Sequence, residues 1–491
     1  MSLSMRGTCA VLLCLGSTAV AALQATVPQR ETVSYLGGPS EGPCGLPQLS
    51  ATARYLVFTC IARDLVPGQF AGTYNTYRRD RSTGIVTRVS IDSQNRPESG
   101  GGDRGFVSAD GNQVVFSSST RLHPDVPPRP IGGPADVFPS HVFLRDLAAS
   151  TTQLIARDPR GAAPPRYGAR LLDVAFARSL VAFDASTDLM ADPPLPFSQP
   201  NQLYLRNWQS GSLERINVRP DGGASAFDAY APSISPDGRY IAFLSGASDL
   251  GPANPTGDSQ LLLRDRQNQT TQRISVPYHG GEFARAYYQW GSAQFSGDGR
   301  YLAITADSEE LVPGGAPDFL DAYVVDLATR RFELISTGHA GQAPDNASFN
   351  SVVSGNGRYV AFYSRARNLT ATPQPYPAVY VKDRATGDIV NVSAALGEPH
   401  QYHVSDISLS EDGSAVAFSW RHRADEPLLG GRWLIYSARL SGAPLAPPMP
   451  VPVLGPRAAG MLGIGIVMLG LYALRRRATR RRVASRYPRA L

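Results

Sequence analysis

The chain has 491 residues, four cysteines and a net charge of +6. Eight arginines after Leu474, with no acidic residue among them, outweigh that excess, so the rest of the chain carries −2, or −3 without Arg6. A near-neutral body argues against a nucleic-acid-binding protein, which needs a basic surface. The terminal arginines bear on membrane topology instead.

Residues 1–21 have the features of a secretory signal peptide. Arg6 supplies a positive start, an apolar stretch runs from Ala10 to Leu15, and Ala19 to Ala21 form a small-residue cleavage site. An N-terminal anchor that is never cut is the alternative. Removal of the signal leaves two of the four cysteines, Cys44 and Cys60.

One phrase recurs seven times along the chain, most clearly as Ser-Pro-Asp-Gly-Arg-Tyr-Ile-Ala-Phe from Ser235 to Phe243. Its closing apolar residues are 56 to 67 residues apart, and they are Phe58, Phe116, Phe183, Phe243, Ile304, Phe362 and Phe418. A period of this size indicates an array of supersecondary units.

Each copy of the phrase predicts a unit of four short strands. In the fourth copy, Asp237-Gly238 between two apolar runs is a strong hairpin signal. The expected strands of this copy are 231–235, 239–245, 260–265 and 271–276. Four-stranded units arranged around a ring make a β-propeller. We therefore predict an all-β fold with a single seven-bladed β-propeller over residues 31–441.

Two details bear on the closure and size of the ring. The seventh unit has no fourth strand of its own, and Glu31–Leu36 resembles the fourth strands elsewhere, so this N-terminal strand is predicted to close the last blade. The third copy has Ala175 to Arg178 where the others carry Asp-Gly. A six-bladed ring with one irregular insertion therefore stays open as an alternative.

The repeats resemble the TolB-type, WD40-like propeller repeats of bacterial envelope and secreted proteins. The resemblance rests on the repeated phrase, on Asp64-Leu-Val-Pro-Gly68 and on Phe143-Leu-Arg-Asp146. It covers about residues 31–441 and implies the fold, whereas propellers of this type serve as scaffolds, binding platforms and enzyme accessory domains alike.

Cys44 and Cys60 are predicted to face one another in the first hairpin. If that hairpin turns about Thr52, the two cysteines stand directly opposite, within reach of a disulfide. Export permits their oxidation. Two buried free thiols are the alternative, and Pro43 or Pro47 would shift the register by bending the strand.

No catalytic residue, cofactor or metal is predicted. The sequence contains no Gly-x-Ser-x-Gly, His-Glu-x-x-His or Cys-x-x-Cys motif and no phosphate-binding glycine-rich loop. His400, His403 and His422 are the best candidates for a metal, but they flank opposite ends of one sheet. Aspartates that recur after the third strand are interpreted as caps of their own turns: Asp80, Asp146, Asp265, Asp326 and Asp383.

Aromatic residues gather where the chain enters two innermost strands. Tyr287, Tyr288 and Trp290 precede the fifth blade, and Tyr402 precedes the seventh. Loops at these places line one mouth of a propeller channel, where aromatic rings suit a sugar ring or a peptide. These four residues are the predicted binding site, with blade-to-blade packing as the alternative.

The C-terminal residues predict a membrane attachment. Residues 442–457 form a proline-rich linker, 458–474 an uncharged run of 17 residues that is predicted as one transmembrane helix, and 475–491 an arginine-rich tail. By the positive-inside rule the tail is cytoplasmic. Val451-Pro-Val-Leu-Gly455 resembles the start of the IPTL class of C-terminal sorting signals of Gram-negative bacteria, with Val in place of Ile and of Thr.

That second resemblance implies a sorting protease and a helix that is later cleaved; an ordinary single-span anchor in the inner membrane is the alternative. The sequence as a whole favours an exported, membrane-tethered or surface-sorted propeller of the cell envelope, periplasmic or at the cell surface. It is expected to bind a protein or a glycan without catalysis. An envelope hydrolase or lyase with its active site at the channel mouth is the competing hypothesis.

Overall fold

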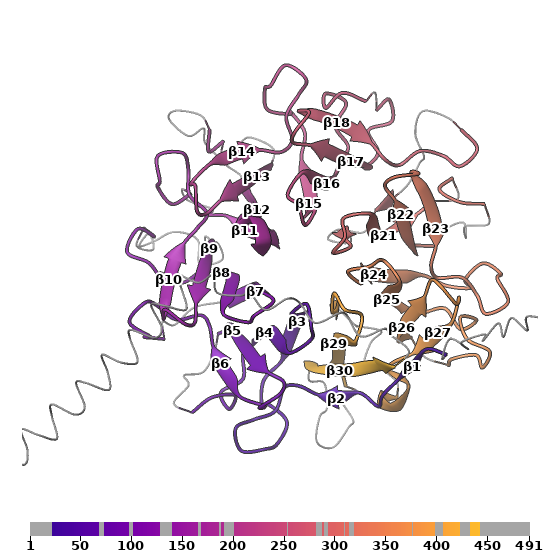
Figure 1. The fold of residues 1–491 in the computed structure, drawn as a ribbon, viewed down its shortest axis with the longest axis horizontal. Coiled ribbons are helices and arrows are strands. Elements are labelled where there is room, and N and C mark those ends of the chain that lie inside the picture. Colours follow the sequence, from indigo (N-terminus) through magenta and orange to yellow (C-terminus); the bar gives the residue numbers. More distant parts are fainter. Residues whose placement is uncertain are drawn as a thin grey trace, which may run out of the picture. The chain divides into compact units, whose positions relative to one another are not determined.

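The described residues form seven antiparallel sheets (Figure 1). The computed structural model describes residues 22–67, 73–97, 102–127, 140–164, 168–185, 188–190, 201–252, 254–280, 287–288, 293–308, 310–313, 319–375, 377–397, 406–422 and 433–441. Within these ranges the structure contains β-strands and two 3-10 turns, η1 (Phe176–Arg178) and η2 (Ala394–Leu396).

The sheets are numbered as blades in chain order, and each has four strand positions from the innermost to the outermost. Blade 1 contains β3 (Cys44–Leu49), β4 (Tyr55–Cys60), β5 (Asn75–Asp80) and β6 (Val86–Arg88). Blade 2 contains β7 (Gly102–Val107), β8 (Gln113–Ser118), β9 (His141–Asp146) and β10 (Thr151–Leu154). Blade 3 contains β11 (Arg170–Ala175), β12 (Leu180–Ala185), β13 (Gln202–Asn207) and β14 (Leu213–Arg215). Blade 4 contains β15 (Ala229–Ile234), β16 (Tyr240–Ser245), β17 (Gln260–Asp265) and β18 (Thr270–Arg273).

Blades 5 and 7 each have one strand position divided between two short strands. Blade 5 contains β19 (Tyr287–Tyr288) and β20 (Gln294–Phe295), then β21 (Tyr301–Asp307), β22 (Asp321–Asp326) and β23 (Arg331–Leu334). Blade 6 contains β24 (Ser348–Val353), β25 (Tyr359–Ser364), β26 (Ala378–Asp383) and β27 (Ile389–Asn391). Blade 7 contains β28 (Ile407–Leu409), β29 (Ala415–Arg421) and β30 (Trp433–Ser441), with β1 (Gln24–Ala25) and β2 (Gln29–Arg30) outermost.

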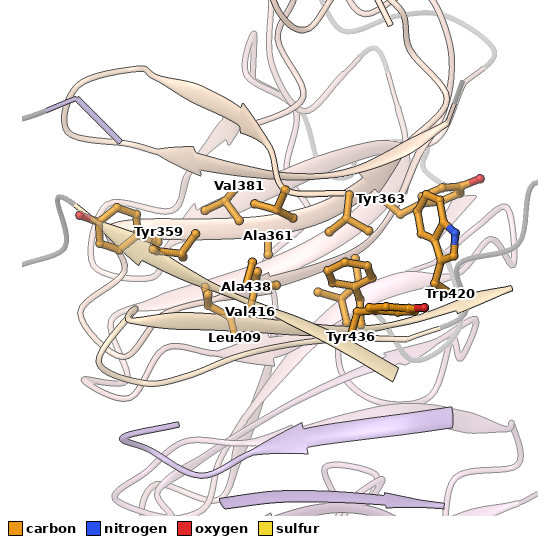
Figure 2. Packing of buried hydrophobic residues seen from close by; sticks show 14 of the residues in the cluster. Tyr359, Ala361, Tyr363, Val381, Leu409, Val416, Trp420, Tyr436 and Ala438 are labelled. Atoms are coloured by element: carbon orange, nitrogen blue, oxygen red, sulfur yellow. The ribbon is translucent and has the colours of Figure 1, made fainter. Parts of the chain in front are cut away.

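Hydrophobic clusters fill the spaces between consecutive blades, and one of them joins blade 7 to blade 1. Figure 2 shows the cluster between blades 6 and 7, where Tyr359 and Val381 face Val416, Trp420 and Tyr436. Burial of such apolar surface is worth about 25 cal/mol per Å² and is the main force that holds the blades together. The structure is therefore a closed seven-bladed propeller, as predicted.

The repeated phrase builds the hairpin between the first two strands of a blade. In blade 4, the Ser235 hydroxyl donates to Asp237 (2.6 Å) and accepts from the amide of Tyr240 (2.8 Å). Gly238 takes a φ of 70°, which favours glycine at this turn. Asp265, at the end of the third strand, accepts from the amide of Gln267 (3.0 Å) and so caps its own turn, as the sequence predicted.

Blade 3 forms a complete sheet although it lacks Asp-Gly. Its hairpin is made by η1 and by Ser179, which takes the left-handed conformation at a φ of 54°. β11 and β12 then pair from Ala175 with Leu180 onward. The degenerate copy is thus a blade, and the six-bladed alternative is excluded.

Blade 7 is completed by N-terminal residues, but not by those that were predicted. β1 pairs with Ser441 and Leu440, and β2 pairs with Ser437 and Tyr436. The prediction that Glu31–Leu36 forms this strand is wrong, because the chain leaves the sheet after the Glu31 amide donates to the Ile435 carbonyl (2.8 Å). Gly37, at a φ of 92°, then closes a turn that directs the chain toward blade 1.

Glu31 joins the closing segment to both neighbouring blades. Its buried carboxylate accepts from Ser437 of blade 7 (2.6 Å) and from Arg81 of blade 1 (2.7 Å), and it pairs with Arg79 (3.1 Å). Arg81 also donates to the Ala53 carbonyl in the first hairpin (2.6 Å). One carboxylate therefore links the two ends of the ring.

A buried cation also crosses from blade 6 to blade 5. Lys382, the single lysine of the chain, is 7% exposed and donates to the Ile335 carbonyl (3.1 Å), the Leu334 carbonyl (3.4 Å) and the Thr337 hydroxyl (3.0 Å). Burial lowers the pKa of this ammonium group. Carbonyl oxygens of the preceding blade thus accept the hydrogen bonds that water accepts from an exposed lysine.

The two faces of the propeller differ in their connections. On one, here called the turn face, short turns join the first strand to the second and the third to the fourth. On the other, here called the loop face, longer segments join the second strand to the third and each blade to the next. The loop face carries most of the exposed large apolar residues among those described: Tyr35, Leu36, Tyr74, Met190, Phe227, Tyr278 and Phe319.

Four predicted segments lie outside the described residues: the signal peptide (1–21), the linker (442–457), the transmembrane helix (458–474) and the tail (475–491). Over the ranges that are described, no helix has the length and apolar character needed to cross a membrane.

Replacement of Glu31 by Ala is predicted to destabilise the propeller by about 3–5 kcal/mol, because it leaves two arginines without their buried partner. Urea unfolding of the purified protein measures this loss. Glu41→Ala is the matched control, since Glu41 is exposed and its side chain belongs to the same N-terminal segment. Equal midpoints for both variants would contradict the role of Glu31 in closure.

Candidate functional site

The innermost strands of all seven blades surround a channel with a cavity of about 380 Å³. Five of these strands are interrupted by a β-bulge at the channel wall, between Gly45 and Gln48 in β3 and at the equivalent places in β7, β11, β15 and β24. Leu46, Ala231 and Asn350 take φ values of 51° to 54° there. Bulges bend a strand and re-aim its groups, so the channel wall is irregular and rich in backbone polar atoms.

A side chain from one blade caps the exposed edge of the next innermost strand at several places around the channel. Each accepts a hydrogen bond from a backbone amide that has no strand partner on that side. The pairs are the Leu49 amide to Ser408 (2.9 Å), Ile234 to Asp173 (2.7 Å), Phe295 to Ser233 (3.2 Å) and Val353 to Gln294 (3.1 Å). Polar side chains of the channel are thus engaged in joining blades.

Among the described ionisable groups that line the channel, Asp173 has the most strongly shifted pKa. Burial raises its pKa to about 6, although hydrogen bonds from the amides of Ile234 and Val174 (2.8 Å) and the charge of Arg104 act in the opposite direction. Both carboxylate oxygens accept from backbone amides, so the group has a structural use in the connection of blade 3 to blade 4.

On the turn face, hairpins of neighbouring blades contact one another. The Asp298 amide donates to the Gly355 carbonyl (2.7 Å), the Gly355 amide to the Glu411 carbonyl (2.7 Å), and the Asp412 amide to the Ala51 carbonyl (3.0 Å). These bonds connect blades 5, 6, 7 and 1 at the inner corner of the ring. Ligand access is therefore expected from the loop face.

A second cavity, of about 480 Å³, lies at the channel mouth on the loop face, between blades 7, 1 and 2. It is called the mouth pocket here. Tyr74 and Trp433 contribute aromatic rings to its lining, Asp103 and Asp406 contribute carboxylates, and Leu46 contributes an apolar chain. Asp103, Asp406 and Leu46 also line the channel, so the acidic groups stand where the pocket meets it.

Close backbone contact between blades 1 and 2 places Tyr74 beside Asp103. The Gly102 amide donates to the Tyr74 carbonyl (2.5 Å), and a Cβ at Gly102 would approach the Thr76 amide nitrogen to 2.7 Å, so this position requires glycine. The hydroxyls of Thr59 (2.9 Å) and Thr76 (3.2 Å) donate to the Asp103 carbonyl. The backbone of Asp103 is therefore held, while its side chain is exposed.

Blades 7 and 1 fix the other side of the mouth pocket. Oδ2 of Asp406 lies 3.4 Å from the amide of Leu46, and the Asp406 amide donates to Ser419 (3.2 Å). The structure pairs Cys44 with Cys60 across β3 and β4 and joins their sulfurs in a disulfide. Cys44 lines the pocket, so a covalent link braces this wall.

The structure describes only part of the aromatic site that the sequence predicted. Tyr287 and Tyr288 form β19, which pairs with Asp307 and Ala306 at the loop-face end of blade 5. Trp290 and Tyr402 lie outside the described residues. The sequence analysis missed Tyr74 and Trp433, which lie at the start of the third strands of blades 1 and 7. Their position could have indicated them, because the loops from the second to the third strand lie on the same face as the loops that enter the innermost strands.

The histidines do not form a described metal site. His422 is buried and its Nε2 lies 2.7 Å from the Tyr436 hydroxyl, whereas His400 and His403 lie outside the described residues. In the described part of the chain, no group of three His, Cys, Asp or Glu side chains is placed to hold a metal ion.

Comparison with known proteins identifies the fold and no family. No family model matches the sequence. No curated protein matches it either. Similar solved structures include an oligogalacturonate lyase in complex with manganese, with a TM-score of 0.50, 13% identity, and coverage of 86% of this chain and 97% of that chain.

Two further similar structures have lower scores. A prolyl endopeptidase has a TM-score of 0.49 and 11% identity, with coverage of 85% of this chain and 52% of that one. TolB from Acinetobacter baumannii has a TM-score of 0.32 and 13% identity, with coverage of 69% of this chain and 79% of that one. At such identities the likeness concerns the propeller fold alone.

The raised pKa of Asp173 predicts a pH dependence of stability. The folded carboxyl titrates near pH 6 and the unfolded one near 3.8, so folding favours the protonated form. This contribution is complete below about pH 4 and is lost as the pH rises to 6, by roughly 2–3 kcal/mol. Asp173→Asn should therefore remove a decline in stability across this interval.

Urea midpoints of the wild type and Asp173→Asn at a series of pH values test this prediction. The difference between the two proteins isolates Asp173 from groups of opposite sign, such as His141, whose pKa burial lowers to about 4. A difference that stays constant from pH 4 to pH 6 would show that Asp173 does not titrate as described.

Proposed function

We propose that this protein is an exported, membrane-tethered or surface-sorted propeller that binds a protein or glycan at its channel mouth and catalyses no reaction. The mouth pocket carries this proposal. It combines aromatic side chains with a few polar groups in a concave site on a rigid frame, which is the usual composition of a ligand site. Its size suits one or two side chains or sugar rings rather than a large cofactor.

The rigidity of the mouth pocket favours binding. Tyr74, Asp103 and Leu46 are held by backbone contacts between three blades and by the neighbouring disulfide. A site that is already ordered before the ligand arrives loses little conformational entropy on association. The propeller thus supplies a preformed surface in the way that propeller scaffolds do.

An envelope location agrees with the disulfide. Cross-linked cysteines persist in oxidising compartments and are rare in the cytosol. With the signal-like residues 1–21 and the apolar and arginine-rich residues 458–491, this supports a propeller outside the inner membrane, attached to that membrane by its C-terminal helix before any cleavage by a sorting protease.

A hydrolase or lyase is the second candidate, and the channel is the observation that favours it. Asp173, with its raised pKa, lies near Arg104 in that channel, and the same fold is used by an oligogalacturonate lyase. However, the oxygens of Asp173 are occupied by backbone amides of two blades. A binding function therefore accounts for the described groups with fewer unexplained features.

A screen of the purified full-length protein against glycan and peptide arrays is the experiment that tests the binding function. Any specific ligand is expected to bind Tyr74→Ala at least ~10-fold more weakly, because central aromatic residues supply much of the energy of such sites. Ile85→Ala is the control, since Ile85 is an exposed apolar residue of the turn face and lies outside the pocket.

Turnover of a substrate that Asp173→Asn abolishes and Tyr74→Ala leaves intact would favour the enzyme instead. Ligands that bind with equal affinity to the wild type, Tyr74→Ala and Asp103→Asn would refute the assignment of the mouth pocket.

A further inference from the structure

We infer that the mouth pocket receives an arginine or lysine side chain from a partner protein. This inference rests on the proposed binding function and names the chemistry of the ligand. The described lining of the pocket contains the carboxylates of Asp103 and Asp406 and no arginine, lysine or histidine. Its charge is therefore complementary to a cation.

Asp103 is the group best placed to pair with that cation. Its carboxylate is exposed, and no hydrogen bond or ion pair to it is found within the described residues, whereas its backbone carbonyl is fixed by two threonines. Hydrogen bonds between a cation and a carboxylate are stronger than neutral ones. Because the backbone of Asp103 is already fixed, little backbone motion has to be lost when its carboxylate pairs with a cation.

The aromatic part of the lining suits the rest of such a side chain. Tyr74, which is 47% exposed, and Trp433 offer ring surface to the aliphatic stem of arginine or lysine and to a cation over the ring face. Leu46 and Pro43 add apolar lining. A neutral sugar would use the rings but would leave the Asp103 carboxylate without a charged partner, and an acidic sugar would be repelled by it.

The rest of the loop face, away from the mouth pocket, favours a protein as the source of the cation. Exposed apolar residues on the loop face come from blades 3, 4 and 5 as well as from the N-terminal segment, and they include Met190, Phe227, Tyr278 and Phe319. Aromatic residues and methionine are enriched in protein interfaces. Arginine is a frequent central anchor in such interfaces, surrounded by weaker contacts.

Fluorescence anisotropy with a labelled peptide that alternates glycine and arginine tests the inference on the purified full-length protein. We expect binding that weakens as salt is added. Asp103→Asn should weaken it ~10-fold through loss of a charge-assisted hydrogen bond. Tyr74→Ala should weaken it at least ~10-fold, as for any ligand of this pocket, through loss of the ring contact. Asp103→Glu should keep most of the affinity.

Asp258→Asn is the matched control, because Asp258 is an exposed aspartate of the loop face that lies outside the mouth pocket. It should bind the arginine peptide like the wild type. A peptide with glutamate in place of arginine should not compete. Thermal melting of each variant shows whether it is folded, and both altered side chains are exposed, so the fold is expected to persist.

Equal affinity of the wild type and Asp103→Asn, or an equal loss in Asp258→Asn, would overturn the inference. So would a neutral or acidic glycan, such as oligogalacturonate, that binds the pocket in preference to the arginine peptide. In that case sensitivity to Tyr74→Ala would still uphold the binding function. The experiment therefore distinguishes a failure of the cation proposal from a failure of the proposed binding function.

Discussion

A ring of sheets is stable only if its last blade is completed by residues from the other end of the chain. Here β30 would present an open strand edge without β1 and β2, and the clusters on both sides of blade 7 would lose their support. The buried carboxylate of Glu31 adds a second link, since it contacts blade 7 and blade 1 together. Closure therefore depends on a short N-terminal segment with little structure of its own.

The same kind of link recurs at two ordinary blade interfaces. Arg266 contacts Glu214 on the outermost strand of blade 3 and the Gly238 carbonyl in its own hairpin. Arg384 likewise pairs with Glu333 of blade 5 (2.7 Å) and donates to the Gly357 carbonyl in its own hairpin. The closing segment thus reproduces with Glu31 an arrangement that is internal to the chain elsewhere. At all three interfaces an arginine of one blade thus contacts both its own hairpin and a glutamate of the preceding blade or closing segment.

The innermost strands explain why the candidate ligand site is at the mouth and not within the channel. Every innermost strand has one edge without a neighbouring strand, and exposed edges invite unwanted pairing. Bulges interrupt these edges, and side chains such as Ser408 and Gln294 accept hydrogen bonds from their unpaired backbone amides. What remains available for a ligand is the wider end, where the long loops begin.

Much of the fold could be predicted from the sequence, because the repeat encodes local contacts. Ser235, Asp237 and Gly238 act within one hairpin, and their pattern alone indicates a blade. The N-terminal strand was misplaced because a short polar alternation fits several registers, and only the turn at Gly37 distinguishes them.

Cys44 and Cys60 lie opposite one another, as the register assumed from the sequence requires, although that register does not hold along the whole hairpin. Leu49 pairs with Leu56 one residue away from the register expected near Thr52, and the bulge after Gly45 restores the register at Cys44 and Cys60. The mouth pocket could not be predicted in this way. Tyr74 and Asp103 come from different blades and meet through Gly102, a contact that no local pattern reports.

The position of Lys382 has a practical consequence for labelling chemistry. It is the single lysine of the chain, and its ammonium group is buried between blades 5 and 6 against carbonyl oxygens. The described surface therefore offers no lysine amine to acylating reagents or amine-directed crosslinkers. Acylation of Lys382 requires separation of these two blades, so its rate, read by mass spectrometry, reports how often the ring opens at that interface.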